Sequence, residues 1–199
     1  MDPAKVKGFL SPVEGQMLSQ YAVQGVLLGE AVEIGSWCGR STIYIANEIA
    51  KTGRLFFAID HHRGSEENQP NWEWFDKEVW DEQAKAIDTL PHFRNNIRLA
   101  KLEATVVAMV GNSAAIGKAW GSPVGFLFLD GGHTMSAALA DYRAWVGHIT
   151  QGGILAIHDV FPDPADGGRP PFEVCEMAIA SGLFARIDQV DSLMVLQRL

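Results

Sequence analysis

The sequence predicts a single α/β domain built on an open, doubly wound sheet whose strands are mostly parallel. Short apolar runs alternate with helical patterns along most of the 199 residues, an order that is typical of βαβ units. Several runs stop abruptly at an acidic or glycine-rich turn, as strands do where a ligand site forms at the carboxyl edge of such a sheet. The last two runs, 185–190 and 193–197, indicate an antiparallel hairpin.

The first predicted element is a helix over residues 11–29, within an N-terminal helical extension that covers 1–30. Ser11 followed by Pro12 is a good helix start, and Glu14 completes a capping-box pattern. The elements that follow are predicted as a strand over 31–35, a helix over 41–51 and a strand over 55–59.

Residues 61–80 interrupt this alternation with a polar, turn-rich and then aromatic segment. A segment of this length at the end of a strand is usually functional. We therefore expect active-site loops at 61–80 and at the proline- and glycine-rich residues 161–171. Helical pattern resumes near Val79 and is predicted to run to Lys101 with a break at Pro91. The remaining elements are predicted as strands over 105–110, 124–129 and 154–157 and helices over 114–120, 136–148 and 172–181.

The composition indicates one globular domain spanning 1–199. Hydrophobic residues make up 47% and charged residues 20% of the chain, and there is no repeat or linker. The net charge of −8 without a Lys/Arg cluster argues against nucleic acid or an anionic membrane as a partner. We see neither a signal peptide nor an apolar run of about 20 residues, so we expect a cytoplasmic protein, and a homodimer is compatible with the sequence. Cys38 and Cys175 are expected to be reduced and buried.

The turn after the first strand carries Glu33, Gly35, Ser36 and Trp37 in a Glu-x-Gly-x-x-x-Gly pattern. This is not the Gly-x-Gly-x-x-Gly dinucleotide fingerprint, because Trp37 and Arg40 stand where that fingerprint needs glycine. A pyrophosphate binds to bare backbone N–H groups, so the bulky Trp37 favours a phosphate-free ligand. Gly35 permits close backbone approach, and Glu33 could attract an ammonium or sulfonium group.

Two further strand ends carry polar groups that suit a nucleoside. Asp60, followed by His61, lies 25 residues after Gly35, and a carboxylate there can accept both ribose hydroxyls; the alternative is a turn cap. After the third strand, Gly111-Asn112-Ser113 places side-chain donors where an adenine edge would lie. The alternative is plain N-capping of the next helix by Asn112 or Ser113. The succession of these motifs at successive strand ends favours a binding site.

The fourth and fifth strands end in Asp130-Gly131-Gly132-His133 and His158-Asp159. Together with Asp141, Trp145 and Gly152-Gly153, these residues resemble the small metal-dependent O-methyltransferases of the catechol and macrolide-sugar types, over roughly residues 30–182. The resemblance implies a class I methyltransferase with a Rossmann-like fold, S-adenosyl-L-methionine (SAM) as cofactor, and O-methylation of a hydroxylated small molecule. The SAM contacts we predict are Glu33, Gly35, Ser36, Trp37, Asp60, His61, Gly111, Asn112, Ser113 and Asp130.

The resemblance also implies a divalent cation and a general base. In that family an Asp ends the fourth strand and two polar residues end the fifth, and all three bind Mg²⁺; here they are Asp130, His158 and Asp159. The family's base corresponds to His133. A cation lowers the pKa of the acceptor hydroxyl and a base takes its proton.

His158 departs from the family's oxygen ligand. Mg²⁺ prefers oxygen, whereas imidazole suits Mn²⁺, Fe²⁺, Co²⁺ or Zn²⁺. Three interpretations stay open: the metal is softer than Mg²⁺, His158 lies outside the metal ligands, or no metal binds and His133 acts with His158 alone.

Other functions fit parts of the pattern. A metal-dependent hydrolase could use the four polar residues of the fourth and fifth strand ends, but Glu33 and Asp60 would then have no role. A non-catalytic SAM- or nucleotide-binding module is a second alternative, and an NAD(P) oxidoreductase is disfavoured by Trp37. The acceptor is expected between the two loops, where Arg169 could bind a substrate carboxylate. His62 is predicted to be a solvated loop residue.

Overall fold

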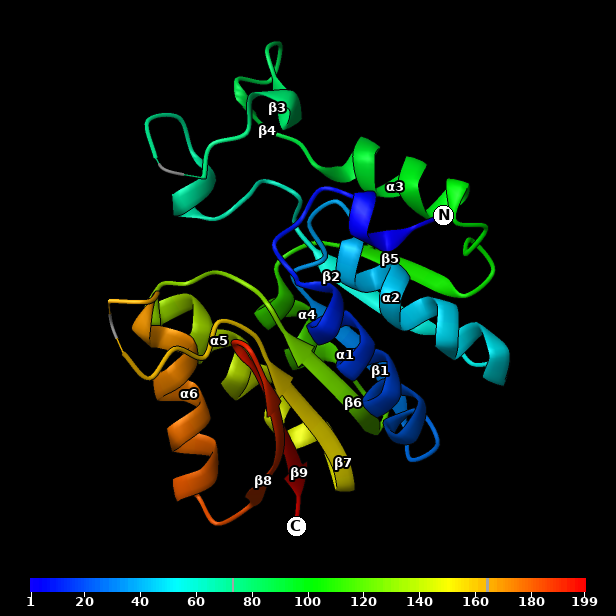
Figure 1. The fold of residues 1–199 in the computed structure, drawn as a ribbon, viewed down its shortest axis with the longest axis vertical. Helices are drawn as coiled ribbons and strands as arrows, with labels where there is room; N and C mark the ends of the chain where they lie inside the picture. The colour runs from blue at the N-terminus through cyan, green and yellow to red at the C-terminus, as the bar shows by residue number, and fades with distance from the viewer. Residues whose placement is uncertain (73, 164) are drawn as a thin grey trace.

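The computed structural model describes residues 1–72, 74–163 and 165–199, and it confirms the predicted α/β class (Figure 1). Within the described residues, the main sheet has seven strands in the order β5-β2-β1-β6-β7-β9-β8. The pairs among the first five strands are parallel, and β9 and β8 add antiparallel pairs at one edge. The strands are β1 Glu30–Ile34, β2 Phe56–Asp60, β5 Val106–Val110, β6 Val124–Leu129, β7 Ile149–Ile157, β8 Phe184–Val190 and β9 Leu193–Arg198.

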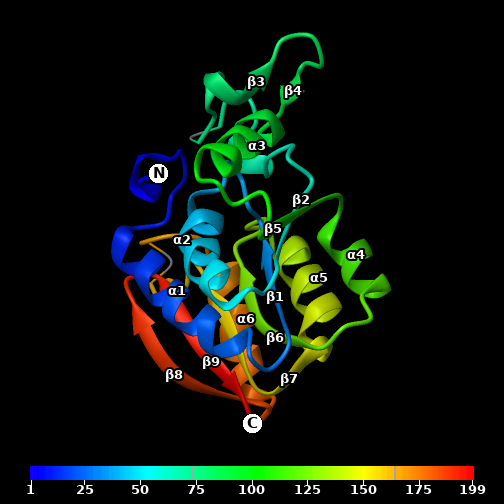
Figure 2. The same ribbon diagram turned by 90° about the vertical axis from the view of Figure 1, so that its right-hand side faces the viewer.

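Helices cover both faces of the sheet, as Figure 2 shows. Helices α1, α2 and α3 pack with one apolar layer and α4, α5 and α6 with the other. None of the helices in the described part of the chain combines the length and apolar composition that crossing a membrane requires. The α-helices are α1 Pro12–Gly25, α2 Arg40–Ile49, α3 Leu90–Leu99, α4 Ser113–Ala119, α5 Met135–Trp145 and α6 Arg169–Ala180. Short 3-10 turns lie at η1 Pro3–Lys5, η2 Ala50–Thr52, η3 Glu66–Asn68, η4 Lys77–Val79 and η5 Val146–His148.

Helix α1 begins as the sequence predicts and ends earlier. The capping box is present: the Glu14 backbone N–H donates to Ser11 Oγ at 3.3 Å, and the Ser11 N–H donates to Glu14 Oε2 at 2.9 Å. The helix ends at Gly25, where its backbone lies so close to Gly125 of β6 that a Cβ on either glycine would collide with the other's backbone oxygen. This close approach seats α1 directly on the centre of the sheet.

The helix predicted from Val79 to Lys101 is wrong in its first half. Two short antiparallel strands, β3 Trp80–Asp81 and β4 Ala86–Ile87, take its place. The Asp81 carboxylate accepts hydrogen bonds from the backbone N–H groups of residues 83 and 84, which closes the turn between them. Helix α3 begins at Leu90 with Pro91 in its first turn, where a missing N–H costs nothing, so this proline starts the helix and does not break it.

Two predicted boundaries near the second loop also shift. Strand β7 begins at Ile149, five residues before the predicted start, and Gly152 takes a left-handed backbone with φ 77° at the irregular part of the strand. Helix α6 begins at Arg169 with two prolines in its first turn, so the loop that follows β7 ends at Gly168, before the predicted end at residue 171. The two cysteines are free and buried, as predicted.

The parallel strands carry the predicted motifs to one edge of the sheet. The register pairs the last residue of β1 with Ile59 of β2 and with the last residue of β6, which in turn pairs with the last residue of β7. Gly35, Asp60, Gly111, Asp130 and His158 therefore all lie at the same carboxyl edge, although they span more than half of the chain.

Candidate active site

The turn after β1 is shaped by Gly35. Its backbone is left-handed, with φ 89°, and a Cβ there would collide with the backbone oxygen of Asp130. Only glycine fits this close approach of the β1 and β6 ends. Trp37 in the same turn also has a positive φ, 46°, which is uncommon for a large side chain. The turn thus brings the end of β1 into direct backbone contact with the end of β6.

Two buried polar atoms at the end of β1 and in this turn lack a hydrogen-bond partner among the described residues: Glu33 Oε1 and Ser36 Oγ. The other oxygen of Glu33 accepts a hydrogen bond from the Thr42 hydroxyl at 2.5 Å. Burial raises the pKa of Glu33 to about 8. Buried polar atoms are almost always satisfied, so two orphaned atoms beside Gly35 are a place where a polar ligand group would fit.

Asp60 joins the turns after β1 and β2. Its Oδ2 accepts a hydrogen bond from the Trp37 N–H at 2.8 Å, and its Oδ1 accepts one from the His62 N–H at 2.7 Å. An ionised carboxylate has about four acceptor positions, so capacity remains for hydroxyl groups of a ligand. Next to it, His61 is exposed and accepts a hydrogen bond at Nδ1 from the backbone of residue 63 at 3.0 Å.

His62 is not the solvated loop residue that was predicted. Its side chain is buried, its Nδ1 lies 2.7 Å from Thr89 Oγ1, and its ring packs 5.3 Å from that of Phe93. Burial lowers the pKa of His62. This histidine therefore anchors the start of the 61–80 segment to the core, a role that its polar sequence neighbours concealed.

Residues after β5 serve the fold in the way the alternative interpretation predicts. Asn112 Oδ1 accepts a hydrogen bond from the Ala115 N–H at 2.9 Å and so caps α4. The Ser113 hydroxyl donates to Asp141 of α5, whose carboxyl has a pKa raised by burial. Asp141 in turn lies against Gly131, where an added Cβ would meet Asp141 Oδ2 at 2.7 Å. These contacts tie the ends of β5 and β6 together.

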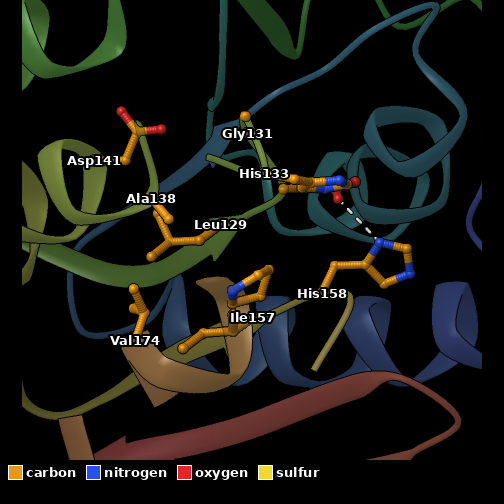
Figure 3. A pocket seen from close by; sticks show the side chains of 11 residues that line it. Leu129, Gly131, His133, Ala138, Asp141, Ile157, His158 and Val174 are labelled. Carbon is orange, nitrogen blue, oxygen red and sulfur yellow. Dashed lines mark hydrogen bonds and ion pairs between the residues drawn. The ribbon is translucent and has the colours of Figure 1, made fainter. Parts of the chain in front are cut away.

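A pocket opens between the ends of β6 and β7 and the first turns of α5 and α6 (Figure 3). Apolar side chains from both strands and both helices form one side of it, and the polar residues of the strand ends form the other. The labelled lining residues are Leu129, Gly131, His133, Ala138, Asp141, Ile157, His158 and Val174.

Three polar side chains at this pocket can share one ion. Asp130, His133 and Asp159 each offer a ligand atom, and these atoms all lie within 4.8 Å of one another. Asp159 has a left-handed backbone, with φ 57°; such strain, typically of order 1–3 kcal/mol, tends to occur at functional sites. These side chains form a compact set that could hold a metal ion, and it contains the predicted ligands Asp130 and Asp159 together with the predicted base His133 in place of His158.

His133 lies between two carboxylates. Its Nε2 is 3.1 Å from Asp159 Oδ2 and its Nδ1 is 3.0 Å from Glu67 Oε2. The hydrogen bond to Asp159 raises the pKa of His133 to about 9, against an opposing effect of burial. Burial raises the pKa of Asp159, but the hydrogen bond from His133 and the charges of His158 and His133 together outweigh it, so the net shift of the pKa is downward.

Glu67 is a site residue that sequence reasoning missed. It lies in η3, inside the 61–80 segment that was predicted to be an active-site loop. The contact with His133 shows that this segment does reach the site. Two adjacent glutamates at 66 and 67 were visible in the sequence, but nothing local indicates which of them points at a histidine 66 residues away.

His158 has both ring nitrogens occupied. Nδ1 lies 3.0 Å from Asp130 Oδ1 (Figure 3), and Nε2 lies 3.3 Å from Glu14 Oε2 of α1. Its side chain is only 3% exposed. Of the three interpretations left open by the sequence, this geometry favours the one in which His158 lies outside the metal ligands.

Glu14 is the second residue that the sequence did not reveal, since it showed there only as part of a capping box. Burial would raise its pKa, but the hydrogen bond with His158 and its other hydrogen bonds lower the pKa of Glu14 to about 2.

The two segments predicted as loops also contain Arg169 and Trp74. The guanidinium of Arg169 is bound to Glu173 at 2.7 Å and to the Pro162 carbonyl at 2.9 Å, and it lies over the Phe172 ring. It is therefore engaged within its own helix start. Trp74 is half exposed and contacts the ring of Phe9 edge-on at 5.6 Å.

The comparisons with known proteins agree with this geometry. A family model described as a methyltransferase domain matches residues 32–160, well over half of the chain. The chain therefore belongs to this methyltransferase-domain family, and the strand-end motifs after β1, β2, β5 and β6 all lie inside the matched part.

Solved structures share the fold at low identity. The O-methyltransferase NovP matches at 15% identity over 92% of this chain and 78% of that chain, with a TM-score of 0.70. An O-methyltransferase from Bacillus cereus, in complex with SAH, matches at 18% identity over 98% and 86%, with a TM-score of 0.64. TomG from Streptomyces achromogenes, in complex with SAM, matches at 15% identity over 96% and 81%, with a TM-score of 0.63. These matches confirm the class I methyltransferase fold.

Proposed function

We propose that this protein transfers the methyl group of SAM to a hydroxyl of a small-molecule acceptor. The observation that carries the proposal is the close approach of the Asp130, His133 and Asp159 cluster to the turn at Gly35, in a chain of the methyltransferase-domain family. The structural neighbours in complex with SAM and SAH are O-methyltransferases by name, which supports the same cofactor and acceptor chemistry here.

The turn after β1 suits the methionine end of SAM. Glu33 Oε1 and Ser36 Oγ need partners, and the ammonium and carboxylate of a methionine moiety can supply them. Asp60 is placed to accept the ribose hydroxyls, and His61 with residues 111–113 would border the adenine. Bound SAM supplies a methyl group on a positively charged sulfur, which makes that carbon open to attack by an oxygen nucleophile.

Asp130 and Asp159 would hold a divalent cation. A cation bound there would lower the pKa of the acceptor hydroxyl. Two carboxylates beside an imidazole suit Mg²⁺ or Mn²⁺, and also Fe²⁺ or Co²⁺. We assign His133 as the base: Glu67 holds its Nδ1, and Nε2, which lies 3.1 Å from Asp159, would take the acceptor proton once a cation draws the Asp159 carboxylate away from it. The acceptor would enter the pocket between the ends of β6 and β7 and the first turns of α5 and α6, beside the apolar side chains of Figure 3.

The nucleoside assignment is tested by titration calorimetry with S-adenosylhomocysteine (SAH), with NAD⁺ as the control ligand. We expect SAH to bind and NAD⁺ not to bind. Asp60→Ala should weaken SAH binding by about 1–3 kcal/mol, the range for hydrogen bonds to a charged group. Equal SAH affinity in this variant would overturn the ribose role of Asp60, and no SAH binding to the wild-type protein would overturn the proposed function.

A further inference from the structure

We propose that Glu14 in helix α1 is a positioning residue of the active site, which locks the His158 ring against Asp130 and keeps His158 out of the metal-ligand set. The inference rests on the proposed function, because it concerns the cation site at Asp130 and Asp159. It assigns a role to a residue that lies outside the part of the chain matched by the family model.

The first observation is the way Glu14 is held. Its side chain is 4% exposed, and both of its oxygens are used. Oε2 accepts from the Ser11 N–H at 2.9 Å and lies 3.3 Å from His158 Nε2, while Oε1 accepts from the Ser192 N–H at 3.1 Å and the Ser192 hydroxyl at 2.9 Å. A capping glutamate needs only the first of these contacts, so capping does not account for the burial of this carboxylate.

The second observation is what the arrangement does to His158. With Nε2 directed at Glu14, the opposite edge of the ring faces the strand-end carboxylates: Nδ1 lies 3.0 Å from Asp130 Oδ1 and 3.5 Å from Asp159 Oδ2. Neither nitrogen is then free to coordinate an ion. One oxygen of Asp130 is engaged by the ring, and the other is left for the cation together with Asp159.

The third observation is that Glu14 ties separate elements together at this point. Ser192 lies in the turn between β8 and β9, Ser11 caps α1, and His158 follows β7. His158, at the end of β7, is thus paired with a carboxylate that another element supplies. Partners of this kind orient metal ligands, and their loss commonly costs 10–100-fold in metal affinity.

The test is a double-mutant cycle on Mn²⁺ binding, read from the electron paramagnetic resonance signal of free Mn²⁺ in the absence of SAM and acceptor. Glu14→Gln and His158→Asn should each weaken Mn²⁺ binding by roughly 10–100-fold, with SAH affinity within about twofold of the wild type in either variant. In the His158→Asn background, Glu14→Gln should cause no further loss, because its effect passes through that ring.

The matched control is Ser11→Ala, which removes the hydroxyl cap of α1 and leaves every contact of the Glu14 carboxylate in place. It should lower the melting temperature without changing Mn²⁺ affinity. If Glu14→Gln does not fold, Glu14→Asp replaces it in the same cycle, because it keeps the charge and shortens the reach to His158.

Two results would overturn the inference alone. The first is unchanged Mn²⁺ affinity in folded Glu14→Gln. The second is an equal loss of Mn²⁺ affinity from Glu14→Gln in the wild-type and His158→Asn backgrounds, which would mean that Glu14 acts only through its charge. Wild-type protein that binds SAH and no Mn²⁺ would overturn the inference together with the cation part of the proposed function.

Discussion

At the scale of single residues, the site is organised by two histidines that each lie between two carboxylates. In each case one carboxylate ends a strand of the sheet and the other comes from an element that packs over the edge. Glu67 supplies the second partner of His133 and Glu14 that of His158. The two rings differ in access, because His133 is partly exposed and His158 is buried. The geometry therefore separates a histidine that can meet an acceptor from one that can only support the site.

His133→Ala should lower kcat by roughly 10²–10⁴-fold, the usual contribution of a positioned base, and leave SAH affinity unchanged. His92→Ala, on the outer helix α3, is the control. If His133 were instead a third metal ligand, the variant would lose Mn²⁺ binding as well, which the measurement of free Mn²⁺ detects. Full activity in the variant would exclude both roles.

The protonation of His133 can be followed separately by NMR. In the cation-free protein Asp159 raises the pKa of His133 to about 9, so the ring should be charged at pH 7. Added Mg²⁺ should lower that pKa, because the cation competes with the ring for the Asp159 charge. An unchanged titration at saturating Mg²⁺ would contradict a cation next to Asp159.

Glu33 should make stability fall as pH rises. Its pKa is raised from 4.5 to about 8, so between these values the folded state keeps a proton that the unfolded state has lost. Linkage then lowers the free energy of unfolding with increasing pH, by at most about 1.4 kcal/mol per pH unit. Glu33→Gln should flatten this dependence between pH 5 and 8 in urea unfolding. Equal slopes in the two proteins would mean that Glu33 is ionised in the fold.

At the scale of elements, the segment between β2 and α3 has a divided role. Its first part is anchored through His62 and carries η3, which delivers Glu67 to the site. Its second part forms the β3–β4 hairpin, a two-stranded sheet that is separate from the main sheet among the described residues. We therefore expect the η3 part to matter for catalysis and the hairpin to matter less.

Glu67→Gln should lower kcat about tenfold or more, because a hydrogen bond to a charged group contributes about 1.5–3 kcal/mol, and it should leave SAH binding intact. Glu66→Gln, its exposed neighbour in η3, is the matched control and should keep full activity. Similar rates for the two variants would show that the contact with His133 plays no part in the reaction.

At the scale of the whole molecule, the sheet edge is held in place from both termini. Helix α1 near the start and the β8–β9 turn near the end meet at Glu14 beneath the strand ends. The turn after β1 and the cluster of Asp130, His133 and Asp159 lie on the same edge because β1 and β6 are neighbours. A ligand that binds there should stabilise the entire fold.

SAH at about 100 times its Kd should add about 2.7 kcal/mol to the free energy of unfolding, because it binds the folded state alone. For a chain of this size that corresponds to a rise in Tm of about 5–10 °C. Differential scanning calorimetry measures the shift, with NAD⁺ at the same concentration as control. A Tm that does not respond to SAH would contradict the cofactor assignment.

Much of the architecture was contained in the sequence, because it is encoded locally. The motifs from Glu33 to Asp159 can be located because each one follows an apolar run that ends in a polar turn. Parallel strands bring these ends to one edge of the sheet. The hairpin at 80–87 was not predicted, because the buried residues Val79, just before it, and Ile87 also satisfy a helical spacing. Only packing against the core decided between a helix and a hairpin.

What the sequence by itself determined is the class of fold and the set of polar residues at the sheet edge. What only the tertiary structure decided is their pairing. The contact between Glu14 and His158 joins residues 144 positions apart, and no local pattern encodes a distance between elements that are brought together only by the packing of helices on a sheet. For that reason His158 could be predicted to belong to the site, whereas its pairing with Glu14, a carboxylate from the opposite end of the chain, could not.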